Sequence, residues 1–139
     1  MAAKDHLNVN QSGRFLIVHR GLAGVHHNEL DMKQRLGTHW SEKEHVAHQF
    51  ATERLESDPE YPEEEKGTVL HAFVHKRHIL DPEKDVDDWN DWANSDDRYV
   101  EHEGEVPLRP NTPVHIFGAT DQYYDKEVPH TFKRRIGRL

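Results

Sequence analysis

The chain has 139 residues, of which 34% are hydrophobic and 32% are charged, and its formal net charge is -8. This length suits one domain, and the low hydrophobic fraction means that a few short apolar runs must supply its core. The negative charge argues against broad nucleic-acid binding, and the lack of cysteine excludes disulfides, thiolate zinc sites and a cysteine nucleophile.

The two ends of the chain are polar. Residues 1–12 are an unpatterned lead-in without the apolar stretch of a signal peptide, and residues 130–139 are expected to be a basic tail. No run in between approaches the roughly 20 apolar residues that a membrane-spanning helix needs. We therefore expect one soluble domain over residues 1–139, located in the cytoplasm.

The first predicted element is a buried strand on the apolar run Phe15–Val18. The strand delivers His19, Arg20 and Gly21 at its end. An arginine there, followed by a glycine that permits close approach of a ligand to the backbone, favours an anion-binding corner. An arginine held in a salt bridge at a strand end is the structural alternative.

A short helix is predicted next, from the capping residue Asn28 to Leu36, where Gly37 ends it. Thr38–Trp40 then has the character of a short extended segment.

Ser41 and Glu44 form an S-x-x-E capping box, which predicts the start of an amphipathic helix that reaches Leu55. The result is a strand-to-helix corner with a serine hydroxyl at its turn. A capped helix without any catalytic role is the simpler interpretation of this corner.

The middle of the chain alternates acidic connections with apolar runs. Residues 56–67 contain two prolines and six acidic residues and predict an exposed loop. Thr68–His75 is a second strand. Residues 85–98 form an acidic flap with a helical turn or two, in which Trp89 and Trp92 are spaced to share one face.

A pair of glutamates precedes the last strong strand. On an extended chain Glu103 and Glu105 point to the same side, and Pro107 indicates a sheet edge or a strand end. Val114–Ala119 is the third strong strand.

Thirteen histidines raise the question of a metal site. The two sets that invite it are His45 with His48, and His71 with His75 and His78. Neither set has a spacing such as H-E-x-x-H, and no carboxylate is placed in sequence to complete it. We therefore expect no metal.

Three motifs follow one another along the chain: a strand ending at Arg20, then Trp40-Ser41 ahead of a helix, then Glu103-x-Glu105 ahead of a proline turn and a strand. This order resembles the ADP-ribosyltransferase superfamily, in the class whose signature is arginine, serine and E-x-E. The resemblance implies an α+β fold in which two small antiparallel sheets, with short helices, form a cleft that binds NAD.

The resemblance also implies roles for individual residues. Arg20 matches the arginine that holds the dinucleotide, and Ser41 matches the serine that orients the catalytic glutamate and the nicotinamide ribose. Glu105 matches the catalytic glutamate, and Glu103 matches the glutamate that helps to accept a target arginine. The neighbours of these motifs are expected to contribute to the NAD site: His19, Gly21 and Trp40.

The implied activity is that of a small bacterial or phage-type enzyme. It would cleave the nicotinamide-ribose bond of NAD and transfer ADP-ribose to a protein side chain, with arginine as the suggested acceptor and no metal required.

An NAD glycohydrolase is one alternative. A non-catalytic accessory protein on the same fold is another, and its contact surface would be the flap with Trp89 and Trp92. An RNA 2'-phosphotransferase shares the superfamily fold, but the acidic charge argues against it.

Overall fold

The computed structural model describes residues 13–31, 34, 36–37, 39–57, 66–94, 104–123 and 125–139, without the side chains of residues 39, 53–57, 132 and 134. The N-terminal lead-in, most of the acidic loop, the end of the flap and Glu103 lie outside these ranges. The described elements are, in chain order, β1 (Phe15–Ala23), η2 (His27–Glu29), β2 (His39–Ser41), α2 (Glu44–Ser57), β3 (Gly67–His75), η3 (Lys76–His78), α3 (Val86–Ala93), β4 (Glu105–Pro107), β5 (Pro113–Gln122) and β6 (Glu127–Arg138).

The described strands form one six-stranded sheet in the order β4-β2-β1-β3-β5-β6, and every neighbouring pair is antiparallel. The α+β class is therefore confirmed, whereas the two small sheets that we expected are replaced by a single sheet. The reason lies in β1 and β3, which pair without interruption from Phe15 opposite His75 to Ala23 opposite Gly67. This continuous central ladder joins both halves of the sheet.

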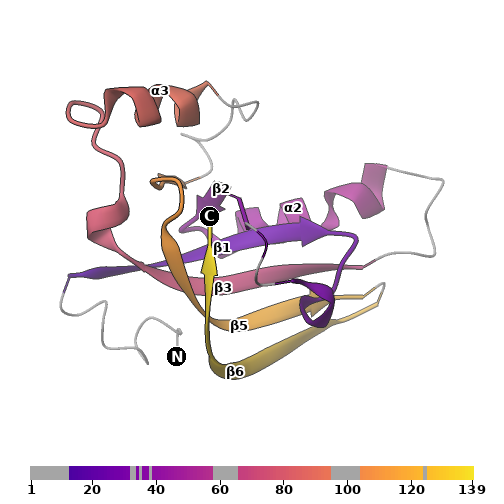
Figure 1. Ribbon diagram of the computed structural model, residues 1–139. Helices are drawn as coiled ribbons and strands as arrows, with labels where there is room; N and C mark the ends of the chain where they lie inside the picture. The colour runs from indigo at the N-terminus through magenta and orange to yellow at the C-terminus, as the bar shows by residue number, and fades with distance from the viewer. Residues whose placement is uncertain are drawn as a thin grey trace.

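The sheet curls around its main core (Figure 1). The C-terminal end of β6 turns back toward β2, where the Leu36 N–H donates to the Arg138 carbonyl at 2.8 Å. The enclosed face, called here the inner face, carries the large apolar side chains, and burial of this area is the main stabilising contribution to such a fold. Its fully buried members include Val18, Trp40, Leu70, Leu108, Val114 and Ile116.

The opposite, outer face of β1 and β3 is covered by α2 (Figure 1). The contact is made by small residues, because Ala47 and Ala51 of the helix pack against Val69. A Cβ at Gly21 would lie 1.8 Å from the Ala47 carbonyl oxygen, so the helix backbone rests directly on the strand at that point. The helix is close to the sheet because glycine leaves it room.

The flap helix α3 confirms the predicted helical turns and shows what its tryptophans do. Trp92 is 8% exposed and packs with Leu80, and Trp89 packs against the same small cluster. Arg109 pairs with Asp85 just before the helix. The tryptophans therefore belong to a local core under an acidic surface.

One predicted element is wrong, and another segment has a structure that was not predicted. The helix expected from Asn28 is a single 3-10 turn, η2, because the Glu29 carboxylate binds the His26 N–H at 3.0 Å and Leu30 is already extended. The extended chain lets Leu30 reach the main core. The segment expected to be a basic tail is most of β6, which pairs with β5 along its length. Its basic residues lie on an edge strand, where charge opposes pairing with further chains.

Candidate functional site

Arg20 of β1 faces the inner side of the sheet, beside its partner Leu70 of the main core. It lines a partly open pocket of about 280 Å³. The guanidinium also packs against Gly37, since a Cβ at that glycine would lie 2.8 Å from Arg20 Nη2. The rest of the pocket lining is apolar with a polar rim: Leu22, Leu30, Asp31, Gln34, Leu36 and Gly37. This volume is at the lower end of ligand pockets, so it suits one part of a dinucleotide.

Ser41 and Glu105 come from the next two strands. Ser41 of β2 lies opposite His19 of β1 on one side and opposite Glu105 of β4 on the other. By this register Ser41 and Glu105 lie on the same side of the sheet as His19, one residue out of step with Arg20, whose side chain faces the other side. Ser41 is buried, and Glu105 is half-buried in an edge strand whose neighbour Gly104 has a φ of 65°.

The expected capping box at the start of α2 takes another form. The helix begins at Glu44, so Glu44 is its first residue and cannot occupy the third position that the box requires. The Ser41 hydroxyl instead accepts from the Lys43 N–H at 3.0 Å, in a turn that precedes the helix. The serine therefore fixes the corner between β2 and α2.

Arg20 and Glu105 are coupled electrostatically. Burial lowers the pKa of Arg20 from its usual value. The negative charge of Glu105 acts in the opposite direction and raises that pKa, but by less. An arginine remains protonated in proteins, so the pair is a buried cation with a neighbouring anion. Within the described residues, Ser41 and Glu105 are not part of the lining of the pocket, in keeping with their register, which sets them on the side of the sheet opposite Arg20.

Three other residues expected at the NAD site are absent from the lining of the pocket beside Arg20. Gly21 faces α2 and permits the close approach of Ala47. Trp40 is fully buried in the main core, and its Nε1–H donates to the Gly37 carbonyl at 2.9 Å. His19 faces the outer side of the sheet, away from the pocket beside Arg20, because successive side chains of a strand point to opposite faces.

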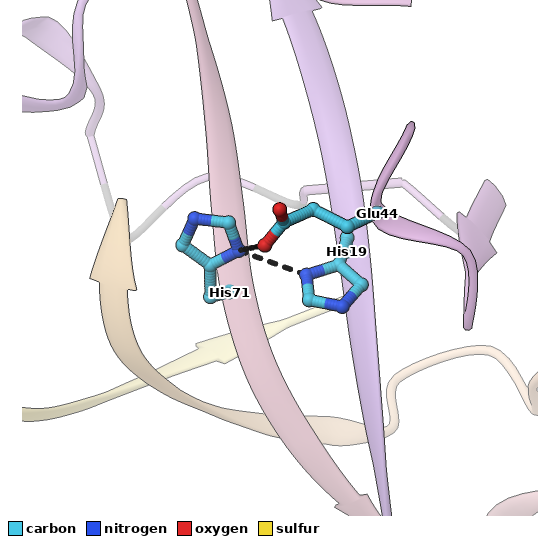
Figure 2. A group of neighbouring side chains, drawn as sticks. All are labelled: His19, Glu44 and His71. Atoms are coloured by element: carbon cyan, nitrogen blue, oxygen red, sulfur yellow. Dashed lines mark hydrogen bonds and ion pairs between the residues drawn. The ribbon is translucent and has the colours of Figure 1, made fainter. Parts of the chain in front are cut away.

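The outer face carries a group of polar side chains that the sequence did not predict as a site. His19 Nδ1 lies 2.8 Å from His71 Nδ1, and Glu44 Oε1 lies 3.6 Å from the same atom of His71 (Figure 2). We call these three residues the outer histidine cluster. Burial lowers the pKa of His19 to about 3, helped by the charges of His71 and His48, so its imidazole is neutral at neutral pH.

A second group lies where β5 and β6 meet η2. The Asp121 carboxylate accepts from the backbone N–H of His27 at 2.9 Å and lies 2.6 Å from His27 Nδ1, while His130 Nε2 is 3.2 Å from the same carboxylate oxygen as Nδ1. Burial alone would raise the pKa of Asp121, but the hydrogen bonds from His27 and from the Thr68 side chain outweigh it and hold that pKa below its usual value.

Sequence spacing had no means of finding either group. The members of the outer histidine cluster come from β1, α2 and β3, and they meet only because β1 pairs with β3 in a register that sets His19 opposite His71. The one available signal was a histidine in each of two adjacent apolar strands.

No protein-family model, curated protein or solved structure matches this chain. Among the helices of the described residues, each is too short or too polar to cross a membrane.

Proposed function

We propose that the chain is an NAD-dependent mono-ADP-ribosyltransferase. The observation that carries this proposal is the adjacency of β1, β2 and β4, which brings the strands of Arg20, Ser41 and Glu105 side by side in the order that the three motifs require. The electrostatic coupling of Arg20 with Glu105 supports it further.

The proposed chemistry assigns the binding of NAD to Arg20. Its planar guanidinium offers paired donors that match phosphate oxygens, and the pocket beside it has room for part of the dinucleotide. The burial of the guanidinium lowers the local dielectric constant, which strengthens such a charge interaction.

Glu105 acts on the ribose. Heterolysis of the bond between C1' and the nicotinamide nitrogen sends the bonding electrons to nicotinamide, which leaves as a neutral molecule, while positive charge develops on the sugar. A fixed carboxylate next to the sugar stabilises that oxocarbenium-like transition state. Ser41 orients the carboxylate from the neighbouring strand.

The acceptor supplies the nucleophile that replaces nicotinamide at C1'. A nitrogen or oxygen lone pair forms the new bond to C1', and the acceptor gives up one proton. The resemblance suggests arginine, through Glu103, whereas attack by water would make the protein an NAD glycohydrolase. For the accessory-protein alternative, one of the two flap tryptophans expected at the contact surface, Trp92, is buried with Leu80, and Trp89 is partly buried beside it.

The test is nicotinamide release from NAD by the purified chain, with and without agmatine as a small arginine-like acceptor. Glu105→Gln should lower release by about 10²–10³-fold, since it removes the charge and little volume. Glu42→Gln, an exposed glutamate near the same corner, is the matched control and should keep full release.

Stimulation of release by agmatine would identify transfer to arginine, and release that is insensitive to agmatine would identify hydrolysis. Glu103→Gln should then weaken transfer and spare hydrolysis. Equal release by the parent chain and Glu105→Gln, or no NAD binding by calorimetry, would overturn the proposal.

A further inference from the structure

The outer histidine cluster contains two imidazoles that face each other without a charged partner between them. His19 and His71 are register partners on β1 and β3, and their Nδ1 atoms are 2.8 Å apart. His19 is 9% exposed and the His71 side chain is 12% exposed. Two nitrogens at this distance must share one proton, or bind something in its place.

The orientation of the His71 ring is fixed by a contact of its other nitrogen, Nε2. Its Nε2 lies 2.8 Å from Thr120 Oγ1 on β5. When Nε2 donates to this hydroxyl, Nδ1 carries the lone pair and points toward His19 and Glu44, as Figure 2 shows. A partner of this kind on the outer nitrogen is typical of metal-ligating histidines, because it sets the tautomer and the ring angle.

Glu44 supplies an anion on the solvent side of the two rings. Its Oε1 lies 3.6 Å from His71 Nδ1, and its Oε2 lies 3.7 Å from His48 Nε2 one turn along α2. The side chain is 56% exposed, so the cluster has an entry from solvent. Helix α2 brings the carboxylate there because its backbone rests directly on Gly21.

We infer that the outer histidine cluster is a binding site for a zinc ion, with His19 Nδ1, His71 Nδ1 and a Glu44 carboxylate oxygen as ligands and a water in the fourth position. The three ligand atoms lie within 4.8 Å of one another. Ligands of a tetrahedral zinc ion are separated by about 3.3 Å, so small rotations of the side chains suffice. Two imidazoles and a carboxylate are a donor set that zinc favours.

The protonation states support the same inference. The pKa of His19 is about 3 and burial also lowers the pKa of His71, so both rings are neutral at neutral pH, the state in which imidazole binds metal. On zinc binding the proton of His19 needs only to move to Nε2.

The second group, His27, Asp121 and His130, is a weaker candidate. Its carboxylate is 3% exposed and is already engaged by the His27 backbone, by the His27 ring at 2.6 Å and by the His130 ring at 3.2 Å. These contacts already occupy both oxygens of the carboxylate.

Zinc at the outer histidine cluster would tie β1, β3 and the first residue of α2 together. It would therefore stabilise the corner that Ser41 forms three residues earlier. The site uses none of Arg20, Ser41 and Glu105 as a ligand, so this inference does not depend on NAD chemistry.

The experiment is titration of the chelator-treated chain with zinc, monitored by competition with a chromogenic chelator. We expect one tightly bound equivalent and a rise in melting temperature that grows with free zinc, as required of an ion that binds only the folded state. Cobalt in place of zinc should give the intense visible absorption of a tetrahedral site.

Substitutions test which residues bind the zinc ion. Thr120→Val, which removes only the orienting hydroxyl, should weaken binding by about 10- to 100-fold, and Glu44→Gln, which removes a ligand, by at least as much. Glu42→Gln and His45→Gln are the controls, because both residues are exposed and flank Glu44. Both should bind zinc as the parent chain does.

His27→Gln tests the competing group and should also leave binding unchanged. Three results would overturn the inference: no binding at micromolar zinc, unchanged affinity in both Glu44→Gln and Thr120→Val, or loss of binding in His27→Gln. Since the Glu44 side chain is largely exposed, Glu44→Gln should fold. The test therefore stays decisive even if a substitution of the buried His71 prevents folding.

Discussion

Two consecutive residues of β1 serve opposite faces of the sheet. Arg20 lies on the inner face beside an open pocket, whereas His19 lies on the outer face against His71 and the start of α2. On the inner face Arg20 is a buried cation, and on the outer face the imidazoles of His19 and His71 are neutral. The contrast teaches that residues next to each other in a motif can belong to sites of different chemistry.

The largest effect is expected from variants that disturb the packing of α2 on the outer face. Gly21→Ala would set a Cβ 1.8 Å from the Ala47 carbonyl oxygen, and the same change at Gly67 sets one 2.2 Å from the Ala51 carbonyl oxygen. We expect each to lower the free energy of unfolding by about 3 kcal/mol or more, the upper end for overpacking, because backbone must move. Urea unfolding measures this.

Gly118→Ala provides the graded comparison for these two variants. Its Cβ would lie 2.9 Å from the His130 carbonyl oxygen, a milder clash on another strand. A loss of stability at Gly118 equal to that at Gly21 would show that α2 does not rest on β1 as described.

The second largest expected effect is the dependence of stability on pH that His19, on the outer face, should cause. In the unfolded chain His19 titrates at 6.5, and in the folded chain at about 3, so acid favours the unfolded state. Stability from this group is full above about pH 6.5 and is lost as the pH falls toward about 3, with a loss of about 2 kcal/mol by roughly pH 5. The charges facing His19 are those of His71, Glu44 and His48.

Thermal unfolding of the metal-free chain between about pH 7 and pH 5 measures this loss, which corresponds to a fall in melting temperature of about 4–8 °C for a chain of this size. His19→Gln should flatten that part of the profile. A parent profile that is already flat would mean that His19 is protonated in the folded state.

The smallest effect concerns the inner face. Arg20→Lys keeps the charge and removes the planar fork, so NAD affinity should fall by about tenfold, the equivalent of one charged hydrogen bond. Zinc affinity should stay the same, because Arg20 and the outer histidine cluster lie on opposite faces. Calorimetry with each ligand measures both, and Arg77→Lys, at an exposed arginine of η3, is the control.

Wherever the signal was local, the sequence predicted the elements well. The apolar runs at Phe15–Val18 and Thr68–His75 became β1 and β3. Pro107 correctly marked β4 as an edge strand. These predictions depend only on periodicity and on the geometry of single residues.

The errors occur where distant partners decide the conformation. Nothing local in residues 127–138 marks a strand, and β6 forms because β5 offers it a complete ladder. The expected helix after Asn28 does not form, and Leu30 is instead extended and packs against the main core.

By itself the sequence determined the strands β1, β3 and β5, the helix α2 and the order of the motifs at Arg20, Ser41 and Glu105, since each rests on neighbours along the chain. Only the tertiary structure decided that β1, β2 and β4 lie side by side and that His19 meets His71 and Glu44. Strand register and the close seating of α2 on Gly21 set these contacts, and both depend on residues too far apart for any local pattern to connect.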